Sequence, residues 1–210
     1  RINVISELPD EWRTHVTRWS AINEGARTLH AEGEAPDRND EWLYYQTLVG
    51  AWPAQPLGAP VPARADTLVV ERLTAYMRKA LKEAKRHTGW LHENQDYEQA
   101  ALGFVEATLT GPTAEAFLAS FVPFQRRLAW FGMINSLAQL LLRIGSPGVP
   151  DVYQGSELWN FALVDPDNRQ PVDFALRRRL LADVQTAAPA DLLAQWPDGR
   201  ATPFTLPRAP

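Results

Sequence analysis

Gly145-Ser-Pro-Gly-Val-Pro-Asp-Val-Tyr-Gln-Gly-Ser-Glu-Leu-Trp159 is the most informative segment of the sequence, together with Leu163-Val-Asp-Pro-Asp-Asn-Arg-Gln-Pro-Val-Asp173 shortly after it. It contains a short apolar segment, Val149–Tyr153, followed by a glycine-bounded turn and a polar loop. An apolar segment of this length is typical of one parallel strand. Polar loops at the carboxyl ends of strands are where α/β barrels hold their sites. The stretch therefore predicts a barrel strand and its functional loop.

The residues before this strand predict a buried helix. Arg126–Arg143 are apolar almost all round, and a helix without a polar face is expected to be buried on more than one side. A helix, a tight turn and a strand form half of a βα barrel repeat, of which a barrel needs eight. The sequence contains only one such unit. We therefore expect a mainly α chain that ends in a partial TIM-barrel segment, the last βα unit.

The rest of the chain is predicted to be helical. Apolar periodicity and helix-start signals indicate helices at about 8–22, 37–49, 67–86, 96–108, 113–122, 176–188 and 190–196. Asp37 or Asn39 is expected to cap the second helix, and Asp66 the third. The predicted organisation is a helical, bundle-like insertion domain over 1–123, a barrel helix, strand and substrate loop over 124–175, and C-terminal helices with an irregular tail over 176–210.

The composition excludes several classes of protein and site. The net charge is −4, from 21 basic and 25 acidic residues without a basic face, so neither nucleic acid nor an anionic membrane is an expected partner. The absence of cysteine excludes disulfides, thiolate zinc sites and cysteine nucleophiles. The longest apolar run, Ser136–Ile144, is too short to span a bilayer. The chain starts at Arg1 without a methionine or a signal-peptide pattern, which predicts that it is part of something longer.

Five segments resemble, in order, those of the maltooligosyltrehalose synthase family of the α-amylase superfamily. Arg1–Trp12 is similar to the segment just after the seventh barrel strand of that family. Tyr45–Pro53 and Lys85–Glu98 resemble its helical insertion. Gly148–Glu157 resembles its eighth-strand motif, and Leu163–Phe174 the loop that follows. The resemblance thus covers nearly all of the chain as far as residue 200.

Two positions depart from the family pattern. Arg169-Gln170 stands where the family usually has two arginines, and the tail after Arg200 does not resemble the family's continuation.

The resemblance implies an activity. Members of this family convert the α-1,4 bond at the reducing end of a maltooligosaccharide into an α,α-1,1 bond within the same molecule, which forms a trehalose unit. They are cytoplasmic isomerases without a cofactor that act by a retaining mechanism with three carboxylates. In the family these carboxylates precede the position of Arg1, so the resemblance implies no catalytic residue in this chain and no activity of the chain alone. Its expected partners are the oligosaccharide and the rest of its own barrel.

The loop after the predicted strand supplies the candidate substrate-binding residues: Tyr153, Gln154, Glu157, Asp165, Asp167, Asn168 and Arg169. Carboxylate, amide and guanidinium groups together offer acceptors and fork-shaped donors to vicinal hydroxyls. The alternative is a self-capping loop in which Asp165, Asn168 and Asp173 satisfy their own turns. Glu157 is alternatively expected to pair with Arg169 and shape the loop.

The loop acids also invite two other interpretations. On spacing alone, a catalytic carboxylate pair among them is possible. A calcium loop is not expected, because Gln170 and Leu176 stand where an EF-hand has glycine and glutamate.

The remaining chemistry-bearing residues point mostly to packing. The four histidines have no metal-ligand spacing and are expected at the surface or at caps. Trp12, Trp19 and Trp130 are expected in the core, whereas Trp90, in a break between helices, is the aromatic residue first expected to line a glucan cleft. The alternative to an enzyme segment is a stand-alone helical scaffold for protein interactions.

Overall fold

The computed structural model describes residues 1–30, 33–55, 58–188 and 190–191. This part of the chain is mainly helical, and it falls into two compact units: the described residues of 1–52 with those of 60–128, and the described residues of 53–59 with those of 129–191. The elements in chain order are α1 (Ile2–Ile5), α2 (Pro9–Ile22), η1 (Glu24–Ala26), β1 (Thr28–His30), β2 (Gly33–Ala35), α3 (Arg38–Ala51), α4 (Thr67–Ala84), α5 (Gln95–Thr110), α6 (Ala114–Gly145), η2 (Asp167–Arg169) and α7 (Phe174–Thr186).

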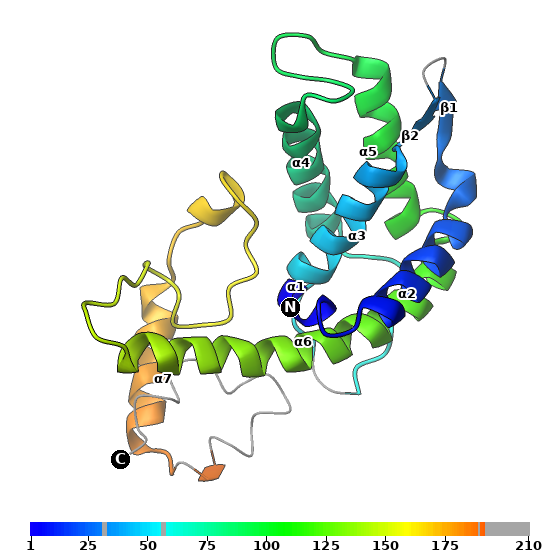
Figure 1. Cartoon of the computed structure of the whole chain (residues 1–210). Coiled ribbons are helices and arrows are strands. Elements are labelled where there is room, and N and C mark those ends of the chain that lie inside the picture. The colour runs from blue at the N-terminus through cyan, green and yellow to red at the C-terminus, as the bar shows by residue number, and fades with distance from the viewer. Residues whose placement is uncertain (31–32, 56–57, 189, 192–210) are drawn as a thin grey trace. The chain divides into compact units, whose positions relative to one another are not determined.

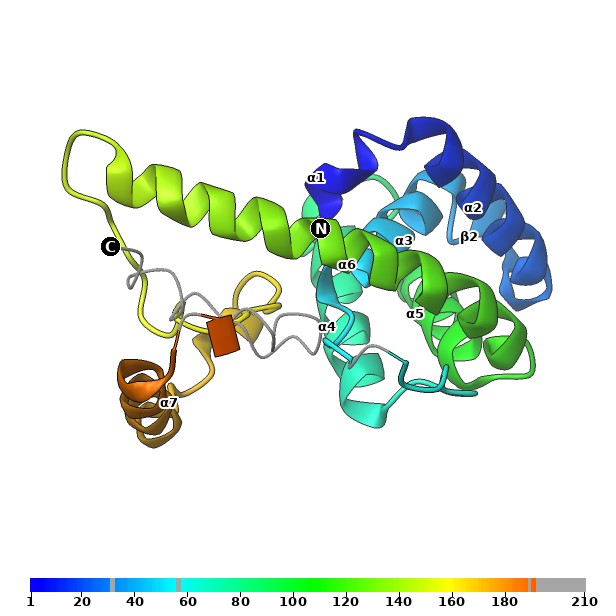
Figure 2. The same cartoon turned by 90° about the horizontal axis from the view of Figure 1, so that it is seen from below.

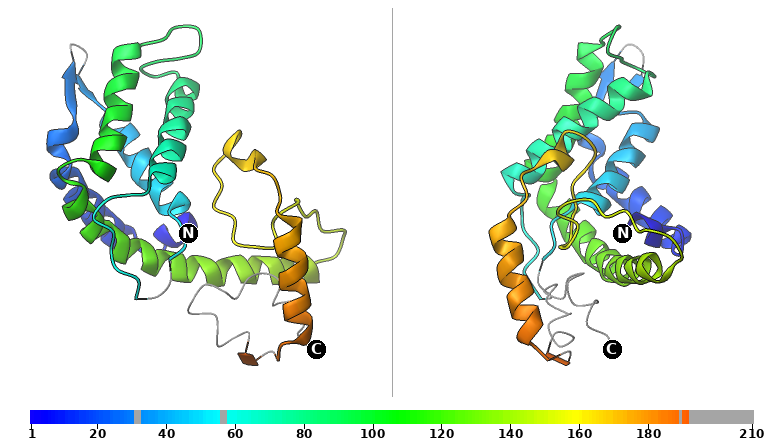
Figure 3. Two further views of the ribbon diagram at one scale, coloured as in Figure 1. Left: turned by 180° about the vertical axis from the view of Figure 1, so that it is seen from behind. Right: turned by 90° about the vertical axis from the view of Figure 1, so that its left-hand side faces the viewer.

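The first unit is built around aromatic side chains. Helices α3, α4 and α5 lie side by side (Figures 1 and 3). The Trp19 ring of α2 is fully buried and lies edge-on to Phe117 and Phe121 of α6, with ring centroids 6.0 and 5.4 Å apart. Tyr44 of α3 packs in the same way against Phe104 of α5. Burial of such large rings is a main source of folding free energy, and it confirms the prediction that Trp12 and Trp19 lie in the core.

The predicted helix starts are confirmed by their caps. The side chain of Asp37 accepts a hydrogen bond from the Asp40 amide at 2.8 Å, and that of Asp66 accepts one from Leu68 at 2.8 Å. Each bond satisfies one of the free amides in a first helical turn. Asn94 caps α5 in the same way.

A short hairpin in the first unit was not predicted. β1 and β2 pair antiparallel, with Thr28 opposite Ala35 and His30 opposite Gly33. By its sequence, Gly33–Asp40 is a polar segment typical of a loop. Three-residue strands are too short to show the alternation of polar and apolar residues by which a strand is recognised.

Helix α6 corrects the prediction of two helices at 113–122 and 126–143. It is one helix of 32 residues with Pro123 inside it (Figure 2). Proline removes one intrahelical hydrogen bond and is expected to break or kink a helix. Here Phe121, Val122 and Phe124, on either side of the proline, are all buried, so packing favours continuation of the helix.

The burial predicted for the second half of α6 is wrong for this chain. Five of its large apolar side chains are between 43% and 68% exposed, namely Phe131, Ile134, Leu141, Leu142 and Ile144, and Trp130 is half-buried. Among the described residues, α6 is also the one helix that is long and apolar enough to cross a membrane. This is weak support for a membrane span, because core helices pass the same test and the first half of α6 lies in the core of the first unit.

The predicted strand Val149–Tyr153 is also absent. These residues have no regular structure, and Val149 is 96% exposed. A parallel strand needs hydrogen bonds from neighbouring strands, and the described part of the second unit contains none. The partial barrel is therefore not formed here, while the mainly helical class is confirmed. The predicted helix at 190–196 and the tail at 202–210 lie largely or wholly outside the described residues.

Candidate functional site

The loop between α6 and α7 carries the seven candidate residues, and they do not form one cluster. Tyr153 and Gln154 lie at the start of a turn with exposed side chains, Tyr153 at 66%. Asn168 and Arg169 are exposed in the short helix η2. Gln154 and Asn168 present amide groups to solvent, Tyr153 presents a phenol, and Arg169 presents a guanidinium. They can therefore donate and accept hydrogen bonds with an external polyhydroxyl ligand.

Arg177 of α7, a residue absent from the predicted set, holds the turn. Its Nε atom lies 2.9 Å from Oε2 of Glu157, and its Nη2 donates to the Gly155 carbonyl at 2.9 Å. The predicted pairing of Glu157 with Arg169 is therefore wrong. Arg177 lies twenty residues from Glu157, and one arginine among three consecutive ones in α7 gave no sequence signal of its own.

Local contacts satisfy part of the loop. Asp165 forms an ion pair with Arg169, and Asp167 accepts a hydrogen bond from the Leu163 amide at 2.6 Å. The side chain of Asp173 caps α7 by accepting from Leu176 at 2.8 Å. These bonds are those expected of a self-capping loop. They also fix the backbone from which Asn168 and Arg169 project.

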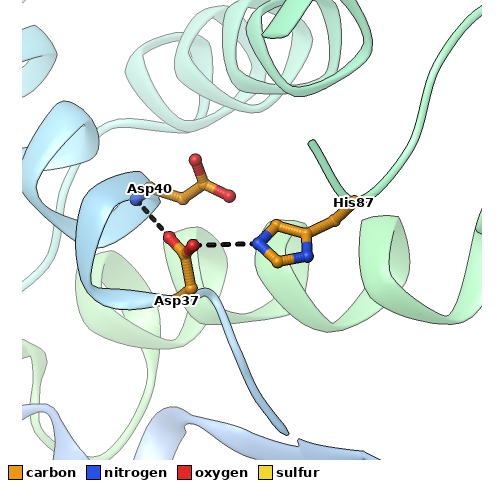
Figure 4. Close-up of side chains that lie close together, drawn as sticks. All are labelled: Asp37, Asp40 and His87. Atoms are coloured by element: carbon orange, nitrogen blue, oxygen red, sulfur yellow. Dashed lines mark hydrogen bonds and ion pairs between the residues drawn. The ribbon is translucent and has the colours of Figure 1, made fainter. Parts of the chain in front are cut away.

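A second polar cluster joins three elements of the first unit. Nε2 of His87, in the loop after α4, lies 2.9 Å from Oδ2 of Asp37, and Asp40 lies beside them (Figure 4). Arg86 also donates to Asp37, at 3.1 Å, and the hydroxyl of Tyr97 donates to Asp40. Burial by itself would raise the pKa of Asp37, but hydrogen bonds from His87 and from the Asp40 amide, with the charge of Arg86, lower that pKa below its ordinary value.

This cluster can hold three ligand atoms close together, but its bonding does not fit a metal. Both oxygens of Asp37 already accept hydrogen bonds, and one of their donors is the cationic Arg86. A cation would have to displace these donors and would face the guanidinium charge. The cluster instead ties the start of α3 to the loop after α4. Sequence reasoning predicted the cap but not the cluster, because His87 is fifty residues away from Asp37.

A concave surface adjoins this cluster. The loop over residues 85–92 lines a cavity of about 470 Å³, whose walls include His87, Trp90, Leu91 and His92. Trp90, which the sequence singles out, is exposed there.

Comparison with known proteins shows which proteins this chain is related to. No protein-family model matches the chain. A protein of Mycobacterium tuberculosis named as a maltooligosyl trehalose synthase is 35% identical over 185 residues, which are 88% of this chain and 21% of that protein. A crystal structure of a maltooligosyl trehalose synthase is 35% identical with a TM-score of 0.80, over 96% of this chain and 25% of the other. The synthase of Arthrobacter ramosus is 34% identical with a TM-score of 0.67, over 86% and 20%.

The chain is homologous to one segment of the maltooligosyltrehalose synthases. This confirms the predicted resemblance. The chain spans about a fifth of the length of the curated relatives that it matches. Because the match to the first of these crystal structures leaves out only 4% of this chain, the helical unit and most of the loop before α7 both correspond to parts of that synthase.

Proposed function

We propose that this chain is the part of a maltooligosyltrehalose synthase that positions the reducing end of the substrate. The single observation that carries the proposal is the 35% identity and the TM-score of 0.80 to such a synthase over 96% of the chain. The complete enzyme converts the terminal α-1,4 bond of a maltooligosaccharide into an α,α-1,1 bond. It is a cytoplasmic isomerase of trehalose biosynthesis that uses no cofactor.

The reaction is a retaining transfer within one molecule. A carboxylate nucleophile forms a glycosyl-enzyme, an acid/base carboxyl protonates the leaving oxygen, and a third carboxylate stabilises the positively charged transition state. The released glucose must then turn and attack before water does, so its pocket must be closed and dry. These carboxylates belong to segments outside this chain. The chain alone is therefore inactive on maltopentaose, and the acids of its loop have structural partners instead.

In this proposal the loop after α6 holds the glucose that reorients. Asn168 and Arg169 project from the short helix η2, and Tyr153 and Gln154 from the turn. Three acids support them: Glu157 pairs with Arg177, and Asp165 pairs with Arg169. Asp167 accepts a hydrogen bond from the Leu163 amide. Fork-shaped and amide donors suit the paired hydroxyls of a glucose ring.

The partial barrel forms part of the same proposal. Residues 1–123 are the insertion after the seventh strand, 124–175 contain the seventh barrel helix and the eighth strand, and 176–210 are the C-terminal helices. Val149–Tyr153 pairs as a strand once barrel neighbours satisfy its backbone. The exposed apolar side chains of α6 support this, since several large apolar side chains exposed on one helix are typical of a helix that another part of a protein covers.

A chimera tests the proposal. The segment of the Arthrobacter ramosus synthase that matches this chain is replaced by residues 1–191 of this chain, and maltooligosyltrehalose formation from maltopentaose is measured. We expect activity from the chimera and none from the 210-residue chain alone. A soluble, folded chimera that neither cleaves nor rearranges maltopentaose would contradict the proposal, and hydrolysis by the isolated chain would contradict the placement of the carboxylates.

A further inference from the structure

The loop between α4 and α5 exposes two large apolar side chains that are adjacent in sequence. Trp90 is 57% exposed and Leu91 is 92% exposed. They line the cavity of about 470 Å³ described above, a size within the roughly 300–1,000 Å³ typical of small-molecule sites. Exposed tryptophan in a concave surface is a feature of recognition sites rather than of a solvated loop.

Internal hydrogen bonds hold this loop in one conformation. The hydroxyl of the buried Thr88 donates to Glu98 at 2.6 Å and accepts from the Asn94 amide at 3.0 Å. The Gly89 amide donates to the His92 carbonyl at 3.0 Å, which closes the turn around Trp90. A ligand that binds here therefore does not have to order the loop, and that part of the entropic cost of binding is avoided.

The orientation of the indole ring is also fixed. The ammonium group of Lys82 lies over the ring of Trp90, 5.0 Å from its centroid. Lys82 is itself held by Glu93 and by Glu98, the latter at 3.6 Å. One face of the indole is thus occupied by a cation, and more than half of the side chain is still open to solvent.

The polar groups around the ring favour a ligand with hydrogen-bond acceptors. The residues lining the cavity supply ammonium, guanidinium and imidazole groups and include no carboxylate among the described residues. The guanidinium of Arg86 is paired with Asp37, whereas the ammonium of Lys85 adds a positive charge to the lining. The exposed indole of Trp90 also matches a ligand with a flat apolar face, which a sugar ring offers and a small inorganic anion does not.

We propose that Trp90 is a platform for a glucosyl unit of a maltooligosaccharide, at a subsite formed by the loop between α4 and α5. The apolar face of the sugar ring stacks on the open part of the indole, Leu91 extends the apolar surface, and His92 donates to a hydroxyl oxygen. The choice of an α-glucan as ligand rests on the proposed function, whereas the platform itself rests on the geometry of the loop.

Binding to the 210-residue chain tests this proposal. The chain is titrated with maltoheptaose while the indole N–H signals are followed by NMR, with the Trp90 signal assigned by its loss in Trp90→Phe. We expect this signal to move saturably. In calorimetric titrations Trp90→Ala should weaken binding about tenfold and Trp90→Phe only about threefold, since phenylalanine keeps a smaller apolar face. Leu29→Ala, which removes another exposed apolar side chain, from strand β1, should leave the affinity unchanged.

Several results would overturn the platform. One is a Trp90 signal that does not move at millimolar maltoheptaose, and another is equal affinity of the Trp90→Ala variant and the unchanged chain. A third is displacement of maltoheptaose by inorganic phosphate, which would indicate an anion site. The test is independent of catalysis. An inactive chimera with intact glucan binding refutes the proposed function alone, and an active chimera without binding at Trp90 refutes the platform alone.

Discussion

Arg177 of α7 reaches back twenty residues to Glu157, with Nε and Oε2 2.9 Å apart, and the same guanidinium donates to the carbonyl oxygens of Gly155 and Asp173. One side chain thus connects the turn that carries Tyr153 and Gln154 to the first turn of α7. Gly155 has a φ of +83°, a conformation that only glycine adopts without strain, and the Arg177 guanidinium would also crowd a β-carbon there. The loop is therefore positioned from α7, not only by its own turns.

Replacing Arg177 by alanine should loosen this turn. Arg177→Ala removes three donated hydrogen bonds, but Glu157 is 39% exposed, so we expect a local effect of roughly 1 kcal/mol, or about fivefold faster amide exchange over residues 155–157. Arg179→Ala, at an exposed position on the same helix, is the matched control. Equal exchange rates in the two variants would show that Arg177 does not hold the loop.

The cap at Asp37 gives a prediction on stability and pH. Asp37→Asn removes the charge but keeps a side chain that can cap α3. Asp37→Ala removes both, so its free energy of unfolding should be about 1 kcal/mol lower than that of Asp37→Asn. The pKa of Asp37 is lowered in the folded chain, so its stabilising contribution is full above its ordinary pKa of 3.8 and is lost as the pH falls through the lower folded value.

Denaturation curves at several pH values below 5 measure this effect. The acid-dependent loss of stability should be smaller in Asp37→Asn than in the unchanged chain. Asp10→Asn, whose carboxylate is almost fully exposed, is the control and should leave the acid dependence as it is. A pH dependence that is the same with and without the Asp37 carboxylate would contradict the prediction.

His15 should make the first unit less stable in weak acid. Its ring stacks on Phe124 with centroids 4.0 Å apart, and burial, with the charges of Arg18 and Arg127, lowers its pKa below the ordinary 6.5 despite the nearby Glu11. As the pH falls, His15 is therefore protonated at a higher pH in the unfolded chain than in the folded chain. The free energy of unfolding should thus decrease as the pH drops below 6.5. In His15→Phe this decline should be smaller, while His92→Gln in the exposed loop should retain it. Urea denaturation between pH 7.5 and 5.5 decides between these outcomes.

The helices could be predicted because their signals are local. Asp37, Asp66 and the apolar stripe of Trp12 and Trp19 each act within a few residues, and each prediction is confirmed. Pro123 shows where local signals fail, because buried neighbours outside its own segment keep α6 continuous. The predicted strand and the predicted burial of α6 require contacts with neighbouring segments, and the described residues do not supply them.

The candidate site shows the same division. The residues of the loop after α6 could be predicted from its composition, but their pairing could not. Glu157 meets Arg177 rather than Arg169, and His87 meets Asp37 across fifty residues. Trp90 was singled out by its place in a break between helices, and its side chain is exposed there; that it binds a glucan stays a prediction. Contacts between distant segments follow from the packing of helices, which periodicity alone does not specify.

Arg169 separates substrate contact from a structural role of the loop. If it holds the reorienting glucose, Arg169→Ala in the chimera should lower rearrangement more than total bond cleavage, because the loosened glucose escapes and water takes its place. Loss of one charge-assisted hydrogen bond costs roughly 1.5–3 kcal/mol, which shifts the partition between the two products by about one to two orders of magnitude. If Arg169 only pairs with Asp165, the substitution should lower both reactions together. Asp165→Asn is the control for the ion pair, since it removes the partner's charge and keeps the guanidinium. Glucose release measured against maltooligosyltrehalose formation, at matched concentrations of folded protein, decides between the two roles, and an unchanged ratio in Arg169→Ala would rule out contact between this residue and the sugar.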